Sequence, residues 1–328
     1  MKVCVLGGGS WGTALAKVLN ENGHDVLVWM RNEERCLEIN ENHVNRKYLP
    51  NVKLPNDLMF STDIDECLKN VKYVLLAIPT QNIRKVLKSL KDEYKESKIF
   101  INVAKGIEIG TDCLISEIVE EETNNSTYVV LSGPSHAEEV GMKLPTVITS
   151  ACLDNKIAKK VQDLFMNDYL RVYTNDDVRG VELGGALKNI IALGAGISDG
   201  VGFGDNAKAA LITRGITEIT RLGLRLGAKE TTFAGLSGMG DLIVTCTSMH
   251  SRNRNCGYLI GQGKTKEDAI AEVGMVVEGI TTTIAAHEIS KKLNIEMPIV
   301  DAMYDIVENG VNVNEAVRKL MNRDKKGE

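Results

Sequence analysis

The sequence predicts an α/β protein in which a doubly wound, mostly parallel sheet is followed by an all-α domain. Apolar runs of strand length alternate with helical patterns as far as about residue 175, and the later segments read as helices. A glycine-rich turn follows the first apolar run directly. With 328 residues, the chain exceeds the size at which one core stops growing, so we expect two domains, 1–177 and 178–328.

The predicted strands are continuous apolar runs, which are typical of a parallel sheet that helices cover on both faces. They are Val3–Leu6, Val26–Trp29, Leu58–Ser61, Tyr73–Ile78, Ile99–Val103, Tyr128–Leu131, Thr146–Thr149 and Leu170–Tyr173. Helical patterns between them include Ile83–Leu90 and Thr111–Glu122. Later helical patterns cover 178–200, 206–226, 265–272, 279–292, 298–308 and 313–322. We expect the active cleft to lie between the two domains.

The first strand runs into Gly7-Gly8-Gly9-Ser10-Trp11-Gly12 and then into a helix rich in small residues. This Rossmann-like arrangement binds a dinucleotide pyrophosphate. Gly7 permits a tight turn, Gly9 lets the backbone approach the phosphates, and Gly12 lets the helix lie close to the strand. The helix that begins near Ser10 presents unpaired amides and a positive dipole end to the anion. The alternative is a glycine turn that binds no nucleotide.

The end of the second strand indicates which dinucleotide is accepted. NAD sites place a carboxylate about 20 residues beyond the glycines, whereas a nearby arginine accommodates a 2′-phosphate. Here the strand ends in Met30-Arg31, and the first acid is Glu33. We predict NADP as the preferred cofactor, with NAD as the second choice and Arg31 on the 2′-phosphate or stacked on the adenine. Otherwise Arg31 is a solvated residue at the start of the next helix.

Composition argues against several classes of protein. The chain is 43% apolar and 25% charged with a net charge of −5, so we expect no nucleic-acid or anionic-membrane partner. Its seven cysteines are scattered and show no metal-ligand spacing, which predicts reduced thiols and no metal site. The first strand begins at Lys2, so we expect no leader peptide, and no apolar run approaches the ~20 residues of a membrane span. We therefore expect a soluble, cytoplasmic protein.

Lys188 is the most unusual residue of the second half. Its same-face neighbours on a helix are small or apolar and include no carboxylate: Gly184, Gly185, Ile191 and Ala192. We therefore expect a desolvated lysine with a lowered pKa, as a general base near neutral pH needs. The adjacent Asn189 is suited to orienting a hydroxyl or amide. The alternative is a lysine whose stem is buried and whose ammonium reaches solvent.

Four further candidates follow strands or begin helices. Lys105 lies at a ligand-facing strand end, where it can polarise a carbonyl or bind an anion. His136 occupies an equivalent loop and is the rival to Lys188 as acid and base. Asp241 ends a glycine turn. Its carboxylate can hold a lysine in an ion pair, accept a hydrogen bond from a substrate hydroxyl, or cap the helix that follows. Ser251-Arg252-Asn253-Arg254 begins a helix, and is either a phosphate receptor or an ordinary solvated turn.

Together these residues resemble the soluble NAD(P)-dependent glycerol-3-phosphate dehydrogenases over almost the whole chain. The match rests on Gly7–Ala14, Lys105-Gly106, Gly133-Pro134-Ser135, Leu187-Lys188-Asn189, Gly240-Asp241-Leu242, Ser251–Arg254 and Val277-Glu278-Gly279. The resemblance implies a Rossmann domain followed by an α-helical domain of the 6-phosphogluconate-dehydrogenase-like type, usually in a homodimer. It also implies the reversible reduction of dihydroxyacetone phosphate to sn-glycerol 3-phosphate, which supplies glycerophospholipid synthesis.

The same resemblance implies residue roles. Lys188 matches the proton donor and acceptor, while Lys105 and Asp241 match positions that contact substrate and organise that lysine. Further substrate positions are Gly133, Ser135, Ser251, Arg252 and Asn253, of which 251–253 form the phosphate-binding turn. Cofactor contacts match Ser10, Trp11, Arg31, Tyr48, Lys105, Ala137, Arg252, Val276 and Glu278.

Two other functions stay open at this point. One is a dehydrogenase of the same architecture that acts on a β-hydroxy acid or a sugar phosphate, since such enzymes also carry a Lys-Asn pair on the first long helix. The other is a non-catalytic sensor that binds NAD(P)H and signals through its helical domain. An assay with NADPH and dihydroxyacetone phosphate separates all three.

Overall fold

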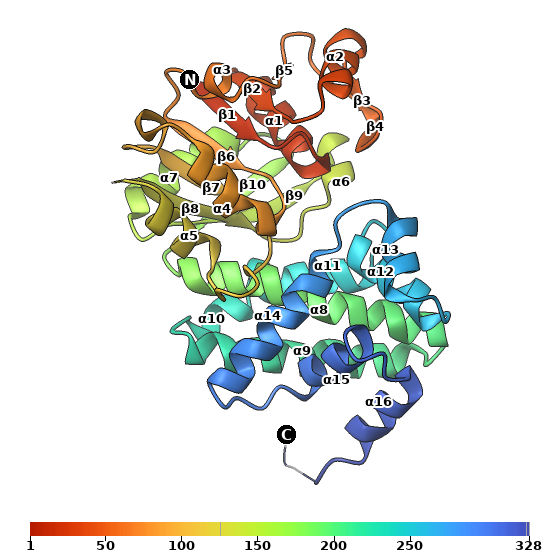
Figure 1. Cartoon of the computed structure of the whole chain (residues 1–328). Coiled ribbons are helices and arrows are strands. Elements are labelled where there is room, and N and C mark those ends of the chain that lie inside the picture. The colour runs from red at the N-terminus through yellow and green to blue at the C-terminus, as the bar shows by residue number, and fades with distance from the viewer. Residues whose placement is uncertain (125, 326, 328) are drawn as a thin grey trace. The chain divides into compact units, whose positions relative to one another are not determined.

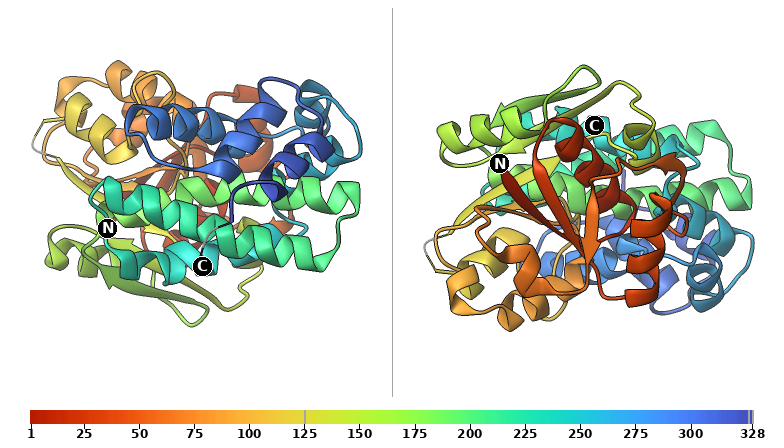
Figure 2. Two further views of the ribbon diagram at one scale, coloured as in Figure 1. Left: turned by 90° about the horizontal axis from the view of Figure 1, so that it is seen from below. Right: turned by 90° about the horizontal axis from the view of Figure 1, so that it is seen from above.

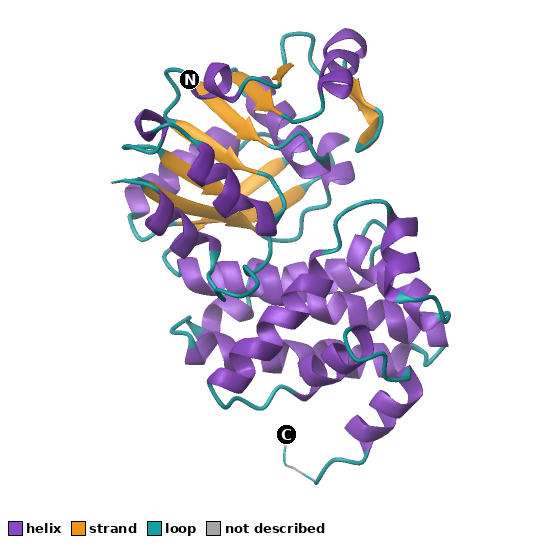
Figure 3. Ribbon diagram, in the orientation of Figure 1, coloured by secondary structure: helices purple, strands orange, loops and turns teal. Residues whose placement is uncertain are grey.

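The computed structural model describes residues 1–124, 126–325 and 327. Contacts along the chain divide it into two compact units. The first comprises Met1–Lys105 and Cys113–Glu182, and the second comprises Gly106–Asp112 and Leu183–Glu328. The strands that the structure describes all belong to the first unit (Figure 3). The change of unit falls inside a long helix, and the domain boundary expected at 177/178 stays a prediction.

An eight-stranded sheet forms the first unit, in the order β10-β9-β8-β7-β6-β1-β2-β5 (Figure 1). Every neighbouring pair is parallel except β8 and β9. The strands are β1 (Lys2–Leu6), β2 (Asp25–Trp29), β5 (Met59–Ser61), β6 (Tyr73–Leu76), β7 (Ile99–Asn102), β8 (Thr127–Ser132), β9 (Thr146–Ala151) and β10 (Leu170–Asn175). Each predicted apolar run overlaps one of these strands, so the predicted mostly parallel sheet is confirmed.

The strand order reverses at β1. The chain proceeds from β1 through β2 to β5 on one side and then returns to β6 on the other side of β1. In open parallel sheets, ligands bind beyond the carboxyl ends of the strands at such a reversal. The loops that follow β1 and β6 are therefore the expected place for a cofactor.

Successive strand residues pack on opposite faces of the sheet, as the pleat requires. Val3 and Val5 belong to one core, and Cys4 and Leu6 belong to the other. The first core is covered by α1 (Ser10–Glu21), α2 (Glu33–Asn42), α6 (Ala137–Gly141) and α7 (Asn155–Phe165). The second is covered by α3 (Ile64–Leu68), α4 (Thr80–Ser89) and α5 (Ile115–Glu122). The turned views of Figure 2 show helices along the sheet.

A two-stranded antiparallel hairpin was not predicted from the sequence. It consists of β3 (Val44–Asn45) and β4 (Leu49–Lys53). The first strand is only two residues long, and the second contains the exposed Pro50 and Asn51, so neither shows an apolar run. A short 3-10 helix at Asp92–Tyr94 was also not predicted.

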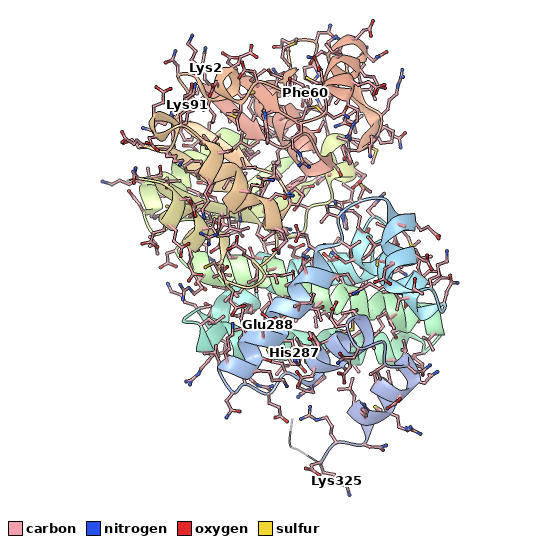
Figure 4. All side chains as sticks on the ribbon, viewed as in Figure 1. Lys2, Phe60, Lys91, His287, Glu288 and Lys325 are labelled. Carbon is pink, nitrogen blue, oxygen red and sulfur yellow. The ribbon has the colours of Figure 1, made fainter. Side chains whose placement is uncertain are left out.

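The second unit contains the remaining helices. They are α8 (Val178–Val201), α9 (Asp205–Arg225), α10 (Glu230–Phe233), α11 (Asp241–Thr247), α12 (Arg252–Gly261), α13 (Lys266–Val273), α14 (Glu278–Lys292), α15 (Pro298–Val307) and α16 (Val313–Met321). All the helical patterns expected after Asn175 are confirmed. The short α10 and a π-helical turn at Leu236–Gly240 were missed. The ring of His287, on α14, stacks on the ring of Tyr304 with 3.9 Å between the two centroids. His287 and its neighbour Glu288 are labelled in Figure 4.

Helix α8 is long and apolar enough to cross a membrane, but its apolar window is completely buried inside the protein. It packs against α12 through glycines. A Cβ at Gly196 would lie 1.9 Å from the carbonyl oxygen of Arg254, and one at Gly257 would lie 2.0 Å from that of Leu193. Only glycine lets the two backbones approach so closely. This contact places α12 alongside the C-terminal half of α8.

The carboxyl of Glu182, on α8, is buried among donors of the first unit. It accepts hydrogen bonds from Ser116 N at 3.0 Å, from Ser116 Oγ at 2.6 Å and from the Tyr128 hydroxyl. Burial raises the pKa of Glu182 from 4.5 to about 7, although these hydrogen bonds oppose the rise. The folded protein therefore holds a proton that the unfolded chain releases at lower pH.

We predict that Glu182→Gln weakens the pH dependence of stability. The wild-type carboxyl contributes fully below pH 4.5, and its contribution is lost as the pH rises through about 7. Across this window the free energy of unfolding of the wild type should fall by up to about 3 kcal/mol more than that of the variant. Urea unfolding at several pH values measures the difference. Parallel profiles for the two proteins would contradict the prediction. Glu218, whose pKa burial also raises to about 7, is present in both proteins.

Candidate active site

The glycine loop between β1 and α1 has the geometry that a dinucleotide pyrophosphate needs. Gly7 has a φ of +125°, and a Cβ there would lie 2.4 Å from the carbonyl oxygen of Ala77. A Cβ at Gly12 would lie 2.0 Å from the carbonyl oxygen of Gly7. Gly9 is the N-cap of α1, and a Cβ there would meet no described atom within 4 Å. Ser10 and Trp11 form the first turn, so their amides begin the helix at an anion-binding position.

Basic residues gather around Tyr48, which lies in the β3–β4 hairpin. Its hydroxyl accepts a hydrogen bond from Arg35 Nη1 at 3.1 Å. The guanidinium carbon of Arg35 and the Nζ of Lys47 each lie 5.5 Å from the ring centroid. Arg31 is exposed immediately before α2. Sequence reasoning did not single out Arg35, which lies in the first turn of α2, four residues beyond Arg31.

The loops after β7 and β8 meet at a single carbonyl. Gly133 O accepts hydrogen bonds from Lys105 Nζ at 3.1 Å and from Ser135 Oγ at 2.9 Å. Because β7 and β8 are parallel neighbours, their carboxyl ends lie at the same edge of the sheet. Asn102 fixes the backbone just before Lys105. Its side chain accepts a hydrogen bond from Ala104 N at 2.9 Å and donates one to Ala104 O at 3.1 Å. The structure thus brings together three predicted substrate residues.

Ala137 and His136 lie in the segment that follows this loop. His136 is the N-cap of α6, and Ala137 is the first residue of that helix. Ala137 is buried. The predicted cofactor position at Ala137 is therefore a backbone position at the start of a short helix, beside the loop that carries Ser135.

In the second unit, Lys188 forms a buried ion pair. Its Nζ lies 2.6 Å from Asp241 Oδ1 and 2.5 Å from Thr245 Oγ1, and all three residues are buried. The Thr245 hydroxyl also bonds to the carbonyl oxygen of Asp241 at 2.6 Å. Thr245 was missed from sequence, although it lies one helical turn beyond Asp241 on α11. These groups fix the direction of the Nζ protons.

Lys188 has no carboxylate among its same-face neighbours on α8, but it has an acidic partner on another helix. The carboxylate comes from α11, which is distant in sequence and packs onto the glycine face of α8. A Cβ at Gly184 would lie 2.5 Å from the carbonyl oxygen of Ser237, just before α11. A neighbouring carboxylate favours the ammonium form, so burial alone does not decide the charge of this lysine. The alternative, in which the ammonium reaches solvent, is also excluded, because only 7% of the Lys188 side chain is exposed.

Asn253 connects three segments that the sequence singled out separately. Its Nδ2 donates to Asn189 Oδ1 at 2.9 Å, and its Oδ1 accepts from Gly279 N at 2.8 Å. The neighbouring Ser251 is the N-cap of α12, and its Oγ accepts from Arg254 N at 3.2 Å. The phosphate-binding candidates therefore lie next to the Lys188-Asn189 pair.

The two arginines of this turn have different environments. Arg254 Nη2 lies 2.6 Å from Asp199 Oδ2, so this guanidinium ties α12 to α8. Arg252 is exposed at the first position of α12. Val276 is exposed ahead of α14, and Glu278 begins that helix. The second unit thus carries these three predicted cofactor positions, whereas the glycine loop, Arg31, Tyr48, Lys105 and Ala137 belong to the first unit.

Comparison with known proteins assigns the family. The model of the NAD-dependent glycerol-3-phosphate dehydrogenase N-terminus matches residues 2–158, and that of the C-terminus matches residues 177–318. A Bacillus cereus (strain B4264) protein named glycerol-3-phosphate dehydrogenase (NAD(P)+) is 55% identical to this chain over an alignment of 330 positions. The alignment covers 100% of this chain and 97% of that protein.

Solved structures agree over the full length. The glycerol-3-phosphate dehydrogenase of Coxiella burnetii is 38% identical with a TM-score of 0.94, and the match covers 98% of both chains. The glycerol-3-phosphate dehydrogenase of Saccharomyces cerevisiae is 31% identical with a TM-score of 0.84, and the match covers 98% of this chain and 99% of that one. The chain therefore belongs to the NAD-dependent glycerol-3-phosphate dehydrogenase family.

Proposed function

We propose that the chain catalyses the reversible reduction of dihydroxyacetone phosphate to sn-glycerol 3-phosphate with a nicotinamide dinucleotide. Relatives with this dehydrogenase name match nearly its whole length. The observation that carries the proposal is the buried pair of Lys188 and Asp241, because it lies next to the Asn189–Asn253 contact. A proton donor is thereby joined to a turn suited to phosphate, which is what a phosphorylated ketone requires.

Lys188 supplies the proton. As an ammonium it donates to the oxygen that becomes negative as the ketone is reduced, and as an amine it accepts that proton in the reverse reaction. Asp241 and Thr245 hold the Nζ by contacts of 2.6 and 2.5 Å. Because this lysine has an organised acceptor set, we assign the proton to Lys188 rather than to His136.

The Gly7–Gly12 loop fits the pyrophosphate of the cofactor, with Ser10 and Trp11 at the start of the helix. NADPH or NADH, when bound, supplies the hydride. We propose that NADP is preferred and that NAD is also used, because Arg31 follows β2 where NAD-selective sites carry an acid. Arg35, four residues beyond Arg31, and Lys47 add positive charge around the Tyr48 ring. Further cofactor contacts are proposed for Lys105, Ala137, Arg252, Val276 and Glu278.

The substrate phosphate is assigned to Ser251, Arg252 and Asn253. The N-terminus of α12 contributes backbone amides and a positive dipole end, and the exposed Arg252 contributes a planar fork of donors. Binding this distant group orients the carbonyl carbon for reaction. We assign to Lys105, which shares the Gly133 carbonyl oxygen with Ser135, the stabilisation of the charge that develops on the substrate oxygen.

The wider setting of the enzyme is also a proposal. Family membership supports a cytoplasmic homodimer whose product supplies glycerophospholipid synthesis. It also supports a division of labour in which 1–177 binds the dinucleotide and 178–328 binds the substrate. A β-hydroxy acid or sugar-phosphate dehydrogenase is the competing assignment, and turnover of dihydroxyacetone phosphate with NADPH decides between them.

Replacing Lys188 with Ala should lower kcat by about 10²- to 10⁴-fold, because the proton donor is removed. The dissociation constant for NADPH should change by less than about twofold, since the glycine loop is in the other unit. Oxidation of NADPH by dihydroxyacetone phosphate measures the first quantity, and a binding titration measures the second. If turnover survives, the proton comes from His136 or another group.

Replacing Arg252 with Ala should reduce kcat/KM for dihydroxyacetone phosphate by about 10- to 100-fold, because a charge-assisted contact is lost. Unphosphorylated dihydroxyacetone is the control. Because Arg252 is also a proposed cofactor contact, both substrates are measured at saturating NADPH, where kcat/KM for dihydroxyacetone should be low in both proteins and nearly unchanged by the substitution. An equal loss for the two substrates would remove Arg252 from the phosphate site.

The wild type should bind NADPH more tightly than NADH. Arg31→Ala should weaken NADPH binding by about tenfold and leave NADH binding within about twofold, because only NADPH carries the 2′-phosphate. Titration of both cofactors into both proteins measures the effect. A wild type that prefers NADH would overturn the assignment of Arg31.

A further inference from the structure

Asn45 is a buried polar residue that none of the assignments above uses. It lies on β3 with 1% of its surface exposed. Its Nδ2 donates to the carbonyl oxygen of Gly8 at 3.0 Å and to Thr13 Oγ1 at 2.9 Å. Its Oδ1 accepts from Tyr48 N at 3.3 Å. One amide thus joins the glycine loop, the first turns of α1 and the hairpin that carries Tyr48.

The bond to Gly8 O fixes the orientation of a peptide in the loop. The carbonyl and N–H of a trans peptide point in opposite directions. When Asn45 holds the Gly8 carbonyl toward the protein interior, the N–H of Gly9 is directed the opposite way. Gly9 is also the residue at which a Cβ would meet no described atom within 4 Å. Asn45 therefore sets the direction of the amide at the position where the backbone is most open.

The bond to Thr13 fixes the helix start relative to the same peptide. Thr13 N donates to Gly9 O at 2.9 Å, which is the first hydrogen bond of α1. The Thr13 hydroxyl, which is fully buried, accepts from the Asn45 amide. The amides of Ser10, Trp11 and Gly12 precede this first closed turn and are the ones that a helix leaves for a ligand.

We propose that Asn45 is a positioning residue for the cofactor: it orients the Gly8–Gly9 peptide and the first turn of α1 so that their N–H groups bind the pyrophosphate. The inference rests on the proposed use of a nicotinamide dinucleotide. Asn45 itself is buried and acts through the loop. An amide suits this position because it donates to two oxygens and accepts from a backbone N–H at the same time.

Two substitutions are compared. Asn45→Asp keeps the shape and the acceptor for Tyr48 N, but it removes the donor to Gly8 O and adds a negative charge, whereas Asn45→Ala removes the donor without adding a charge, so a loss shared by both variants is not due to charge repulsion. Binding of two ligands is compared by calorimetry: NADPH, and adenosine 2′-monophosphate, which lacks the pyrophosphate. The dissociation constant for NADPH should rise by at least about tenfold, because a buried carbonyl loses its donor. That for adenosine 2′-monophosphate should change by less than about twofold.

Asn22→Ala is the matched control. Asn22 Nδ2 donates to Leu164 O at 2.8 Å, so it anchors the opposite end of the same helix to a backbone carbonyl. Its loss should lower the melting temperature and leave NADPH binding unchanged. If Asn45→Asp does not fold, Asn45→Ala alone is judged by the same criterion. If neither variant folds, Thr13→Val is measured instead. Its dissociation constant for NADPH should rise by about two- to threefold, and that for adenosine 2′-monophosphate should stay unchanged.

Two results would overturn the inference. One is an Asn45 variant that binds both ligands equally more weakly, which indicates a general structural loss. The other is an Asn45 variant whose NADPH binding is unchanged. The proposed function is tested separately by wild-type turnover of dihydroxyacetone phosphate. A wild type that binds NADPH without this turnover refutes the function and leaves Asn45 in place. A variant with unchanged NADPH binding refutes the role of Asn45 and leaves the function in place.

Discussion

A buried ammonium requires a carboxylate, and the Lys188–Asp241 ion pair is the constraint around which the helical unit is organised. Leaving one charge of such a pair without its partner costs about 3–5 kcal/mol. Helix α11 must therefore lie against α8, and the absence of a Cβ at Gly184 allows it. Thr245, on the same helix as Asp241, completes the contacts of Nζ. The same three groups thus satisfy an energetic requirement of the fold and form the proton donor that we propose.

Asparagine side chains perform a common task at the candidate loops of each unit. Asn45 holds the glycine loop, Asn102 holds the segment before Lys105, and Asn253 joins Asn189 to Gly279. Each amide pairs a donor and an acceptor without adding charge, so it can be buried beside groups that bind anions. These amides therefore hold in place the loops that we propose to bind phosphate. Asn45 and Asn102 do so without a proposed contact to a ligand, whereas Asn253 is also assigned to the substrate phosphate.

Most of the sheet was predictable because its strands are continuous apolar runs and its helices show regular periodicity. The β3–β4 hairpin was not, since a two-residue strand carries no periodic signal. Helix spacing could not assign the partner of Lys188, because Asp241 lies far along the chain and spacing reports only neighbours within one turn; only the family resemblance linked the two residues. Asn45 and Thr245 escaped notice for the same reason. The Gly106–Asp112 segment, which follows Lys105 and belongs to the helical unit, also gave no local sign of its placement.

The role of the ion pair is tested most directly by the pH dependence of kcat for ketone reduction in the wild type and in Asp241→Asn. The substitution keeps the size of the side chain and removes its charge. If Asp241 stabilises the ammonium that donates the proton, the fall in rate at high pH should move to lower pH in the variant, because a buried amine without a carboxylate loses its proton more readily. Superimposable profiles, with only a uniform loss of rate, would contradict this account of Lys188.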